Sequence, residues 1–288
     1  MTTLFDAQTS MVSIRASRHS RNFLARLARQ PAVLVQVEST QGSVPREPGA
    51  WMAVFGDASM GTIGGGNVEY RAIAQARAML AAVPPSKPPA VSTRYALGPA
   101  LGQCCGGVMR LRFEHVSPSD GPVLAAALGG GLTPLALFGG GHVGDALVRV
   151  LASLPFQVTW IDSRDAVFPA DVPEHVACEQ SEPPQAAVAG LAPRSRVLIM
   201  SFSHAEDLDV VAACLERQRE HADLPFVGLI GSKTKWATFR RRLEARGFSA
   251  AELAHVTCPI GIAGIAGKEP EVIAVAVAAQ LLQTLGPA

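Results

Sequence analysis

The pattern of apolar and polar residues changes once along the chain, in a Pro- and Gly-rich stretch after residue 116. Before this break, apolar and polar positions alternate in several short runs, which predicts half-buried strands. The clearest runs are "AVLVQVEST" (32–40), "AVSTRYAL" (90–97) and "VMRLRFEHV" (108–116). A hairpin is expected across "WMAVFGD" and "MGTIGGG", and helical spacing predicts helices over 10–29 and 66–83.

After the break, the apolar runs no longer alternate. "PLALF" (134–138), "RVLIMSF" (196–202) and "PFVGLIGS" (225–232) are continuous, and helical patterns lie between them. Such runs indicate a parallel sheet covered on both faces. The last helix, expected over 269–285, has no polar stripe, which predicts burial in this domain or against the first one.

The expected fold class is therefore α/β, with an N-terminal mixed α+β domain followed by a Rossmann-like parallel-sheet domain. The predicted domains span residues 1–120 and 134–288, and residues 121–133 are expected to link them. A chain of 288 residues is long enough for two domains that each have a core.

Composition narrows the class of protein. Apolar residues make up 48% of the chain and charged residues 17%, which favours a packed globular protein over a disordered one. A net charge of +1 gives no basic field for nucleic acid or an anionic membrane. No apolar stretch reaches the roughly 20 residues of a membrane span, and the first residues lack a secretory signal's apolar core. We expect a cytoplasmic protein.

Two adjacent cysteines, Cys104 and Cys105, stand in "LGQCCGG" between two predicted strands. No second cysteine pair is near enough in sequence to complete a zinc site with them. A disulfide between neighbouring residues would close a strained small ring, so a free dithiol is expected. A loop between strands is a common place for functional residues, although two small residues could also simply suit a tight loop.

A glycine motif follows the first apolar run of the second domain. Gly139, Gly141 and Gly144 satisfy G-x-G-x-x-G between a predicted strand and helix, and Asp162 ends the next strand. Glycines let a phosphate approach the backbone, the helix N-terminus favours its charge, and Asp162 could accept hydrogen bonds from ribose hydroxyls. The alternative is that these glycines serve only turns and packing. Arg164 complicates the ribose interpretation.

Other polar residues are expected near the same sheet edge. His142 lies inside the glycine loop and His204 follows a buried strand, so each is a ligand contact or a loop histidine with a local bond. Ser232, Lys233 and Lys235 near a helix start could hold an anion.

The expected helix over 66–83 has two polar residues at its start. Asn67 is a plausible N-cap. Glu69 is interpreted as a stabiliser of the first helical turn or, alternatively, as a proton carrier.

Several segments, taken in order, carry a family resemblance: "GSVPREPGAWMAV", "GTIGGGNVEYRAIAQA", "ALGPALGQCCGG", "ALFGGGHVG", "GLIGSKTKWATFRRRL" and "PIGIAGIAGKEPEVIAVAVAAQLL". From about residue 30 onward the chain resembles the xanthine dehydrogenase accessory protein family, XdhC, which includes accessory proteins of carbon monoxide dehydrogenase. "LGQCCGG" looks like the branch that serves xanthine dehydrogenase. Asn67 stands where relatives often carry Cys or His, and "PIGIAGIAGKEPE" departs slightly from the usual motif.

The resemblance implies a molybdenum cofactor (molybdopterin) chaperone that is not itself an enzyme. Such a protein shelters the cofactor while a cysteine desulfurase replaces an oxo ligand of molybdenum with sulfur, and then delivers it to apo-xanthine dehydrogenase, at the molybdenum-binding subunit. A homodimer would be in keeping with such a family. The residues expected to bind the cofactor are Gln103, Cys104, Cys105, Gly139, Gly141, His142, Gly144 and Asp162, with Cys104 and Cys105 facing the metal and no catalytic residue.

Three alternatives remain at this point. The glycine loop and Asp162 alone would suit an NAD-dependent oxidoreductase. The protein could act only as a scaffold through partner contacts. In a variant of the carrier hypothesis, a cysteine would itself carry persulfide sulfur to the metal.

Overall fold

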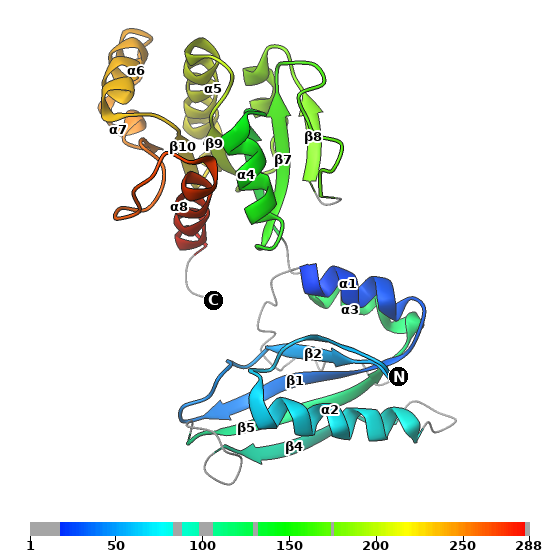
Figure 1. Ribbon diagram of the computed structural model, residues 1–288. Coiled ribbons are helices and arrows are strands. Elements are labelled where there is room, and N and C mark those ends of the chain that lie inside the picture. Colours follow the sequence, from blue (N-terminus) through cyan, green and yellow to red (C-terminus); the bar gives the residue numbers. More distant parts are fainter. Residues whose placement is uncertain (1–17, 83–87, 98–105, 129–131, 174–175, 286–288) are drawn as a thin grey trace. The chain divides into compact units, whose positions relative to one another are not determined.

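The computed structural model describes residues 18–82, 88–97, 106–128, 132–173 and 176–285 (Figure 1). The chain divides into two compact units, residues 1–131 and 132–288. Gln103, Cys104 and Cys105 lie outside the described residues. Among the described residues, no helix is long and apolar enough to cross a membrane.

The first unit is built on a five-stranded sheet with the order β3-β2-β1-β5-β4. Every neighbouring pair in it is antiparallel. The strands are β1 (Ala32–Gln41), β2 (Trp51–Val54), β3 (Ser59–Gly61), β4 (Val91–Ala96) and β5 (Val108–Val116). The predicted strands and the hairpin are confirmed.

Helices cover the two faces of this sheet, as Figure 1 shows. Helix α2 (Gly66–Ala81) packs on one face over Val35, Met109 and Leu111. On the other face, Phe23 of α1 (Arg18–Leu27) and Leu124 of α3 (Gly121–Leu128) pack on Leu34 and Ala53. A short 3-10 helix, η2 (Pro118–Asp120), precedes α3.

Two predictions for this unit differ from the structure. Residues 121–133 were expected to form a linker, yet α3 occupies Gly121–Leu128 and buries Leu124 completely in the first unit's core. Asn67 was expected to cap α2, but the N-cap is Gly65, because the chain needs a positive φ of 73° there.

The second unit holds a six-stranded sheet with the order β11-β10-β9-β6-β7-β8, and all its neighbouring strands are parallel. The strands are β6 (Thr133–Phe138), β7 (Phe156–Asp162), β8 (Val176–Gln180), β9 (Arg196–Ile199), β10 (Phe226–Leu229) and β11 (Val256–Thr257). Counted within the unit, this is the doubly wound order 3-2-1-4-5-6, which confirms the predicted Rossmann-like domain.

Both faces of the second sheet are covered, which explains its continuous apolar runs. One face packs on α4 (His142–Leu151) and α8 (Pro270–Gln283). The other packs on α5 (His204–His221), α6 (Lys233–Ala245), α7 (Ala250–Leu253) and the 3-10 helix η3 (Pro184–Gly190). Of the two predicted places for the last helix, α8 takes the first: it packs on α4 inside its own unit.

Candidate functional site

The glycine loop lies where the strand order of the second sheet reverses. The loop connects the end of β6 to α4, and β6 has β7 on one side and β9 on the other. Backbone hydrogen bonds hold the loop to both neighbours: Gly139 N–H donates to Ile161 at 2.8 Å, and Met200 N–H donates to Phe138 at 2.8 Å. In open α/β sheets this reversal opens a crevice at the carboxyl ends of the strands, where ligands bind.

The glycines of the motif differ in whether packing requires a glycine at their position. Gly139 has a φ of 119°, and an ideal Cβ there would lie 2.0 Å from the Met200 carbonyl oxygen. A Cβ on Gly144 would lie 2.2 Å from the Gly139 carbonyl oxygen. Packing alone therefore requires both glycines.

Gly141 differs from these two positions. An ideal Cβ there meets no described atom within 4 Å, and its φ of −81° suits any residue. Gly141 is the N-cap of α4, and none of the described side chains caps this helix. The first-turn N–H groups of α4 therefore lack a side-chain acceptor, and the space beside Gly141 is open to a ligand.

Asp162 closes the loop from the side of β7. Its carboxylate accepts hydrogen bonds from the Gly140 N–H at 2.6 Å, the Arg164 N–H at 2.8 Å and the Arg164 guanidinium at 2.9 Å. Burial raises the pKa of Asp162, but these bonds from Arg164 and Gly140 outweigh it, so the pKa lies below its usual value. Only 1% of the Asp162 side chain is exposed. Both carboxylate oxygens thus have partners inside the protein.

Arg164 extends this cluster toward the end of β9. Its guanidinium lies over the ring of Phe202 at 4.6 Å from the ring centroid, and Phe202 itself is 67% exposed. Next to it, the Ser163 hydroxyl donates to Glu206 at 2.8 Å. The loops after β7 and β9 are thereby joined by an arginine–aromatic contact and a hydrogen bond. Sequence reasoning missed the role of Phe202, whose only signal was its place at the end of the apolar run over 196–202.

The predicted histidines lie at this edge without a shared partner. His142 is the first residue of α4 and is exposed. His204 is the first residue of α5, also exposed, and its ring meets Phe239 edge-on with 6.2 Å between centroids. The structure therefore places both histidines at strand carboxyl ends and assigns neither of them a hydrogen bond among the described residues.

Lys235 was expected to help bind an anion, but it has an internal partner. Its ammonium lies 2.6 Å from Asp207 Oδ2 and donates to the Ile230 carbonyl at 2.9 Å. Asp207 is buried and also accepts from the Ser201 N–H at 2.8 Å. This pair fixes the loops after β9 and β10, while Ser232 caps α6 by accepting from the Lys235 N–H. Lys233 remains exposed.

Glycine-rich loops also gather at one end of the first sheet. Glu69, in the first turn of α2, accepts hydrogen bonds through Oε2 from the Thr62 hydroxyl at 2.6 Å, the Ile63 N–H at 3.1 Å and the Gly65 N–H at 3.0 Å. Its carboxylate therefore organises the loop that precedes the helix. An ideal Cβ on Gly64 would lie 2.5 Å from Pro45 Cγ, so this loop packs tightly on the one after β1.

The cysteine loop is anchored at the same end. Leu97 N–H donates to the Gly107 carbonyl at 2.8 Å, which closes the base of the segment between β4 and β5. An ideal Cβ on Gly107 would lie 2.4 Å from the Ser43 carbonyl oxygen and 2.7 Å from that of Gln41. The chain that leaves the two cysteines is thus held against the loop after β1.

The described residues do not form a metal centre of their own. Within them, no group of three or more His, Cys, Asp or Glu side chains is arranged to hold a metal ion. Cys178, Cys214 and Cys258 are free thiols, exposed, buried and half-buried respectively.

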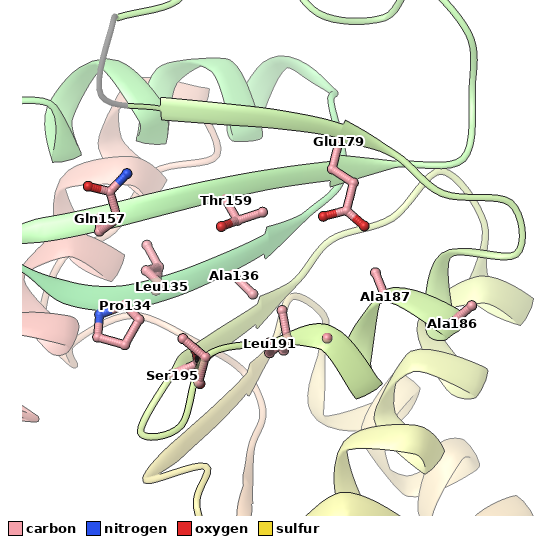
Figure 2. Close-up of a pocket in the computed structure, with 12 residues that line it drawn as sticks. Pro134, Leu135, Ala136, Gln157, Thr159, Glu179, Ala186, Ala187, Leu191 and Ser195 are labelled. Atoms are coloured by element: carbon pink, nitrogen blue, oxygen red, sulfur yellow. Dashed lines mark hydrogen bonds between the residues drawn. The ribbon is translucent and has the colours of Figure 1, made fainter.

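One hollow of about 400 Å³ lies away from the predicted residues. It is bounded by β6, β7, β8 and the η3 segment, and Figure 2 shows Thr159 and Glu179 on the strands facing Leu191 and Ala187 across it. The connection from β8 to β9 contains the short helix η3 instead of a long α-helix, which leaves this part of the sheet face thinly covered. No predicted site residue lines the hollow.

Comparisons with known proteins identify both parts of the chain. A model described as the XdhC Rossmann domain matches residues 135–281, and a model of the XdhC and CoxI family matches residues 25–86. The uncharacterised Escherichia coli K12 protein YqeB is 30% identical over 258 residues, covering 88% of this chain. This chain spans only 43% of that relative's length.

A solved structure shares the fold. The crystal structure of a protein from Bacillus halodurans, described as a xanthine dehydrogenase, superimposes with a TM-score of 0.75. The match covers 92% of this chain and 95% of that chain at 19% sequence identity. At that identity the likeness establishes the architecture of both units and nothing further.

Proposed function

This chain belongs to the XdhC and CoxI family, and from that premise we propose that it carries the molybdenum cofactor as cargo. The protein binds the cofactor, shelters it while a separate cysteine desulfurase exchanges an oxo ligand of molybdenum for sulfur, and delivers it to apo-xanthine dehydrogenase. In this proposal it is a maturation factor without a catalytic step of its own.

The observation that carries the proposal is the open position at Gly141. Molybdopterin bears a phosphate, and a phosphate needs unpaired backbone N–H groups and room for close approach. Gly139 and Gly144 are explained by packing, whereas the space beside Gly141 and the uncapped start of α4 have no partner among the described residues. These features support an anion site at the start of α4.

The first unit contributes soft donors to the proposal. Thiolates suit sulfur-bound metal centres and sulfur transfer, so Cys104 and Cys105 are assigned to the molybdenum end of the cargo. The base of their loop is closed by the hydrogen bond from the Leu97 N–H to the Gly107 carbonyl. The proposal includes both a thiol that shields the metal and a thiol that itself carries persulfide sulfur.

Cofactor content tests the proposal directly. The full chain is purified from cells that make the cofactor, and bound pterin and molybdenum are quantified. We expect both in the wild type and a clear loss in a Cys104→Ala, Cys105→Ala double variant. Cys178→Ala is the matched control, because Cys178 is an exposed free thiol of the second unit. Wild-type protein that holds neither pterin nor molybdenum would contradict the proposal.

A second candidate function is an NAD-dependent oxidoreductase, favoured by the doubly wound strand order and the glycine loop. Asp162 argues against it. The acid expected to accept ribose hydroxyls is buried and paired with Arg164 at 2.9 Å. Parallel titrations with NADH and with molybdenum cofactor separate the two functions: tight NADH binding with hydride transfer to a substrate would defeat the carrier proposal.

A further inference from the structure

Two arginines stand opposite each other on neighbouring strands of the first sheet, near the base of the cysteine loop. In the antiparallel pairing of β4 with β5, Arg94 stands directly opposite Arg110. Directly opposed side chains point to the same face and lie close together, and like charges in this arrangement are unfavourable. Both arginines are exposed. Within the described residues, neither forms an ion pair with a carboxylate, so nothing there compensates the two charges.

The neighbours of this pair supply hydrogen-bond donors. Ser39 of β1 stands opposite Arg110, and in the adjacent row Arg112 stands between Gln36 and Ser92. We call these six residues the arginine face: Gln36, Ser39, Ser92, Arg94, Arg110 and Arg112. Two acids lie close to these residues. Glu38, the exposed extra residue of the β1 bulge, stands beside Ser39 and forms no ion pair with a described residue, whereas Glu114 lies one row beyond Arg112 and pairs with it at 3.4 Å. The arginine face is therefore positively charged around Arg94 and Arg110.

The arginine face lies on the side of the sheet away from α2. Tyr95, Met109 and Leu111 alternate with its residues and pack under α2. Helices α1 and α3 cover the same side of the sheet only over the cluster around Leu34 and Ala53. This leaves Arg94 and Arg110 open to solvent at the end where the glycine-rich loops gather.

The distance to the cysteine loop is short. Arg94 is two residues before the end of β4 at Ala96, and Arg110 is two residues after the start of β5 at Val108. At the rise of a strand this is about 7 Å from the base of the loop that carries Cys104 and Cys105. The arginine pair therefore lies close to the base of this loop, which Leu97 and Gly107 close.

We propose that Arg94 and Arg110 bind a tetrahedral oxyanion on the open face of the first sheet. Two guanidinium forks match such a group, because each offers paired N–H donors to two oxygens. The binding of the anion removes the repulsion between the two arginines. The identity of the oxyanion rests on the proposed function: because the phosphate of the cargo is assigned to Gly141, the arginine pair takes a molybdenum oxyanion or free inorganic phosphate, and both share this chemistry.

Thermal unfolding of the full chain tests the site. Unfolding temperatures are measured at constant ionic strength in chloride, with inorganic phosphate, and with molybdate, for the wild type, Arg94→Gln, Arg110→Gln and the control Arg77→Gln. Arg77 is an exposed arginine of α2, on the opposite side of the sheet. We expect at least one anion to raise the unfolding temperature of wild type and Arg77→Gln about 2–4 °C more than that of the two site variants. The anion that gives the larger rise in unfolding temperature is the one that the site prefers.

Protection from arginine modification gives an independent readout. Phenylglyoxal labelling of the wild type, quantified by mass spectrometry, should fall at Arg94 and Arg110 when that anion is present and stay constant at Arg77. An equal thermal shift in all four proteins, or unchanged labelling of the pair, overturns the inference. Protection by phosphate or molybdate in a protein that retains no pterin would sink the proposed function and leave the oxyanion site standing. Normal pterin retention with unchanged labelling of Arg94 and Arg110 would leave the proposed function standing and sink the oxyanion site.

Discussion

Asp162 and Gly140 are joined by a hydrogen bond of 2.6 Å from the backbone N–H of Gly140 to the carboxylate of Asp162. The bond ties the glycine loop after β6 to the end of β7. Arg164 holds the same carboxylate from the other side. The acid at the strand end thus acts as an internal anchor that fixes the shape of the loop, and the loop in turn leaves Gly141 open.

Replacing Asp162 with asparagine should destabilise the second unit. The amide cannot accept the same set of charged hydrogen bonds, and it leaves Arg164 without its carboxylate, so we expect a loss of about 2 kcal/mol in unfolding free energy. Urea unfolding measures it. Asp171→Asn is the control, because Asp171 pairs with Arg149 in an exposed position and should change stability little. Equal losses in the two variants would contradict the anchoring role.

The contribution of Asp162 should depend on pH in one direction. Its folded pKa lies below the usual value, so the carboxylate stabilises the fold above the unfolded pKa of about 3.9. That stabilisation is lost as the pH falls through the folded pKa. The stability difference between wild type and Asp162→Asn should therefore be full at neutral pH and shrink in acid. A difference that stays constant down to low pH would show that charge is not the cause.

The glycine loop permits a graded substitution series. Gly139→Ala and Gly144→Ala place a Cβ at 2.0 Å and 2.2 Å from carbonyl oxygens, so both variants should fold poorly or melt far below the wild type. Gly141→Ala meets nothing within 4 Å and should melt near the wild type. If Gly141 borders the cargo, this variant should nevertheless retain less pterin. Normal retention by a well-folded Gly141→Ala protein would remove Gly141 from the site.

Glu69 should matter more than its exposure suggests. Its Oε2 holds three groups of the loop before α2, so Glu69→Gln weakens charge-assisted bonds and should cost about 1–2 kcal/mol in unfolding free energy. The loop over residues 62–66 should also become more sensitive to limited proteolysis. Glu47→Gln, an exposed glutamate in the neighbouring loop, is the control. If both variants behave alike, Glu69 does not organise the loop.

The free thiols of the second unit should react in a fixed order. Burial raises the pKa of Cys214 to about 12, so almost no thiolate exists at neutral pH and the group is also sheltered from reagents. Cys178 is exposed. Iodoacetamide labelling of the native protein, followed by peptide mass spectrometry, should modify Cys178 and spare Cys214 until the protein is denatured. Early modification of Cys214 would mean that the core around α5 opens readily.

The sequence predicted the elements whose signals are local. Alternation identified β1, β4 and β5, continuous apolar runs identified β6, β9 and β10, and the glycine motif marked the turn into α4. Helix α3 was missed because its short Ala-rich pattern resembles a linker, and only the packing of Leu124 on α1 shows its role. The loss of alternation correctly predicted two different sheets, since burial on one or both faces leaves a direct trace in the pattern.

Contacts that depend on register could not be predicted in this way. Arg94 and Arg110 are 16 positions apart in sequence and meet only because the β4–β5 pairing places them opposite each other. Lys235 was predicted as an anion ligand from its place near a helix start, but Asp207, 28 positions earlier, neutralises it. Partners of charged groups come from the tertiary fold, and a sequence pattern does not contain them.

Cofactor delivery is the central step of the carrier function, and reconstitution measures it. Apo-xanthine dehydrogenase is incubated with molybdenum cofactor, a cysteine desulfurase and its sulfur source, with and without this chain, and recovered xanthine oxidation is followed over time. We predict faster and more complete activation with the wild-type chain, and little gain with the Cys104→Ala, Cys105→Ala variant. Identical activation with and without the wild-type chain would contradict the carrier function.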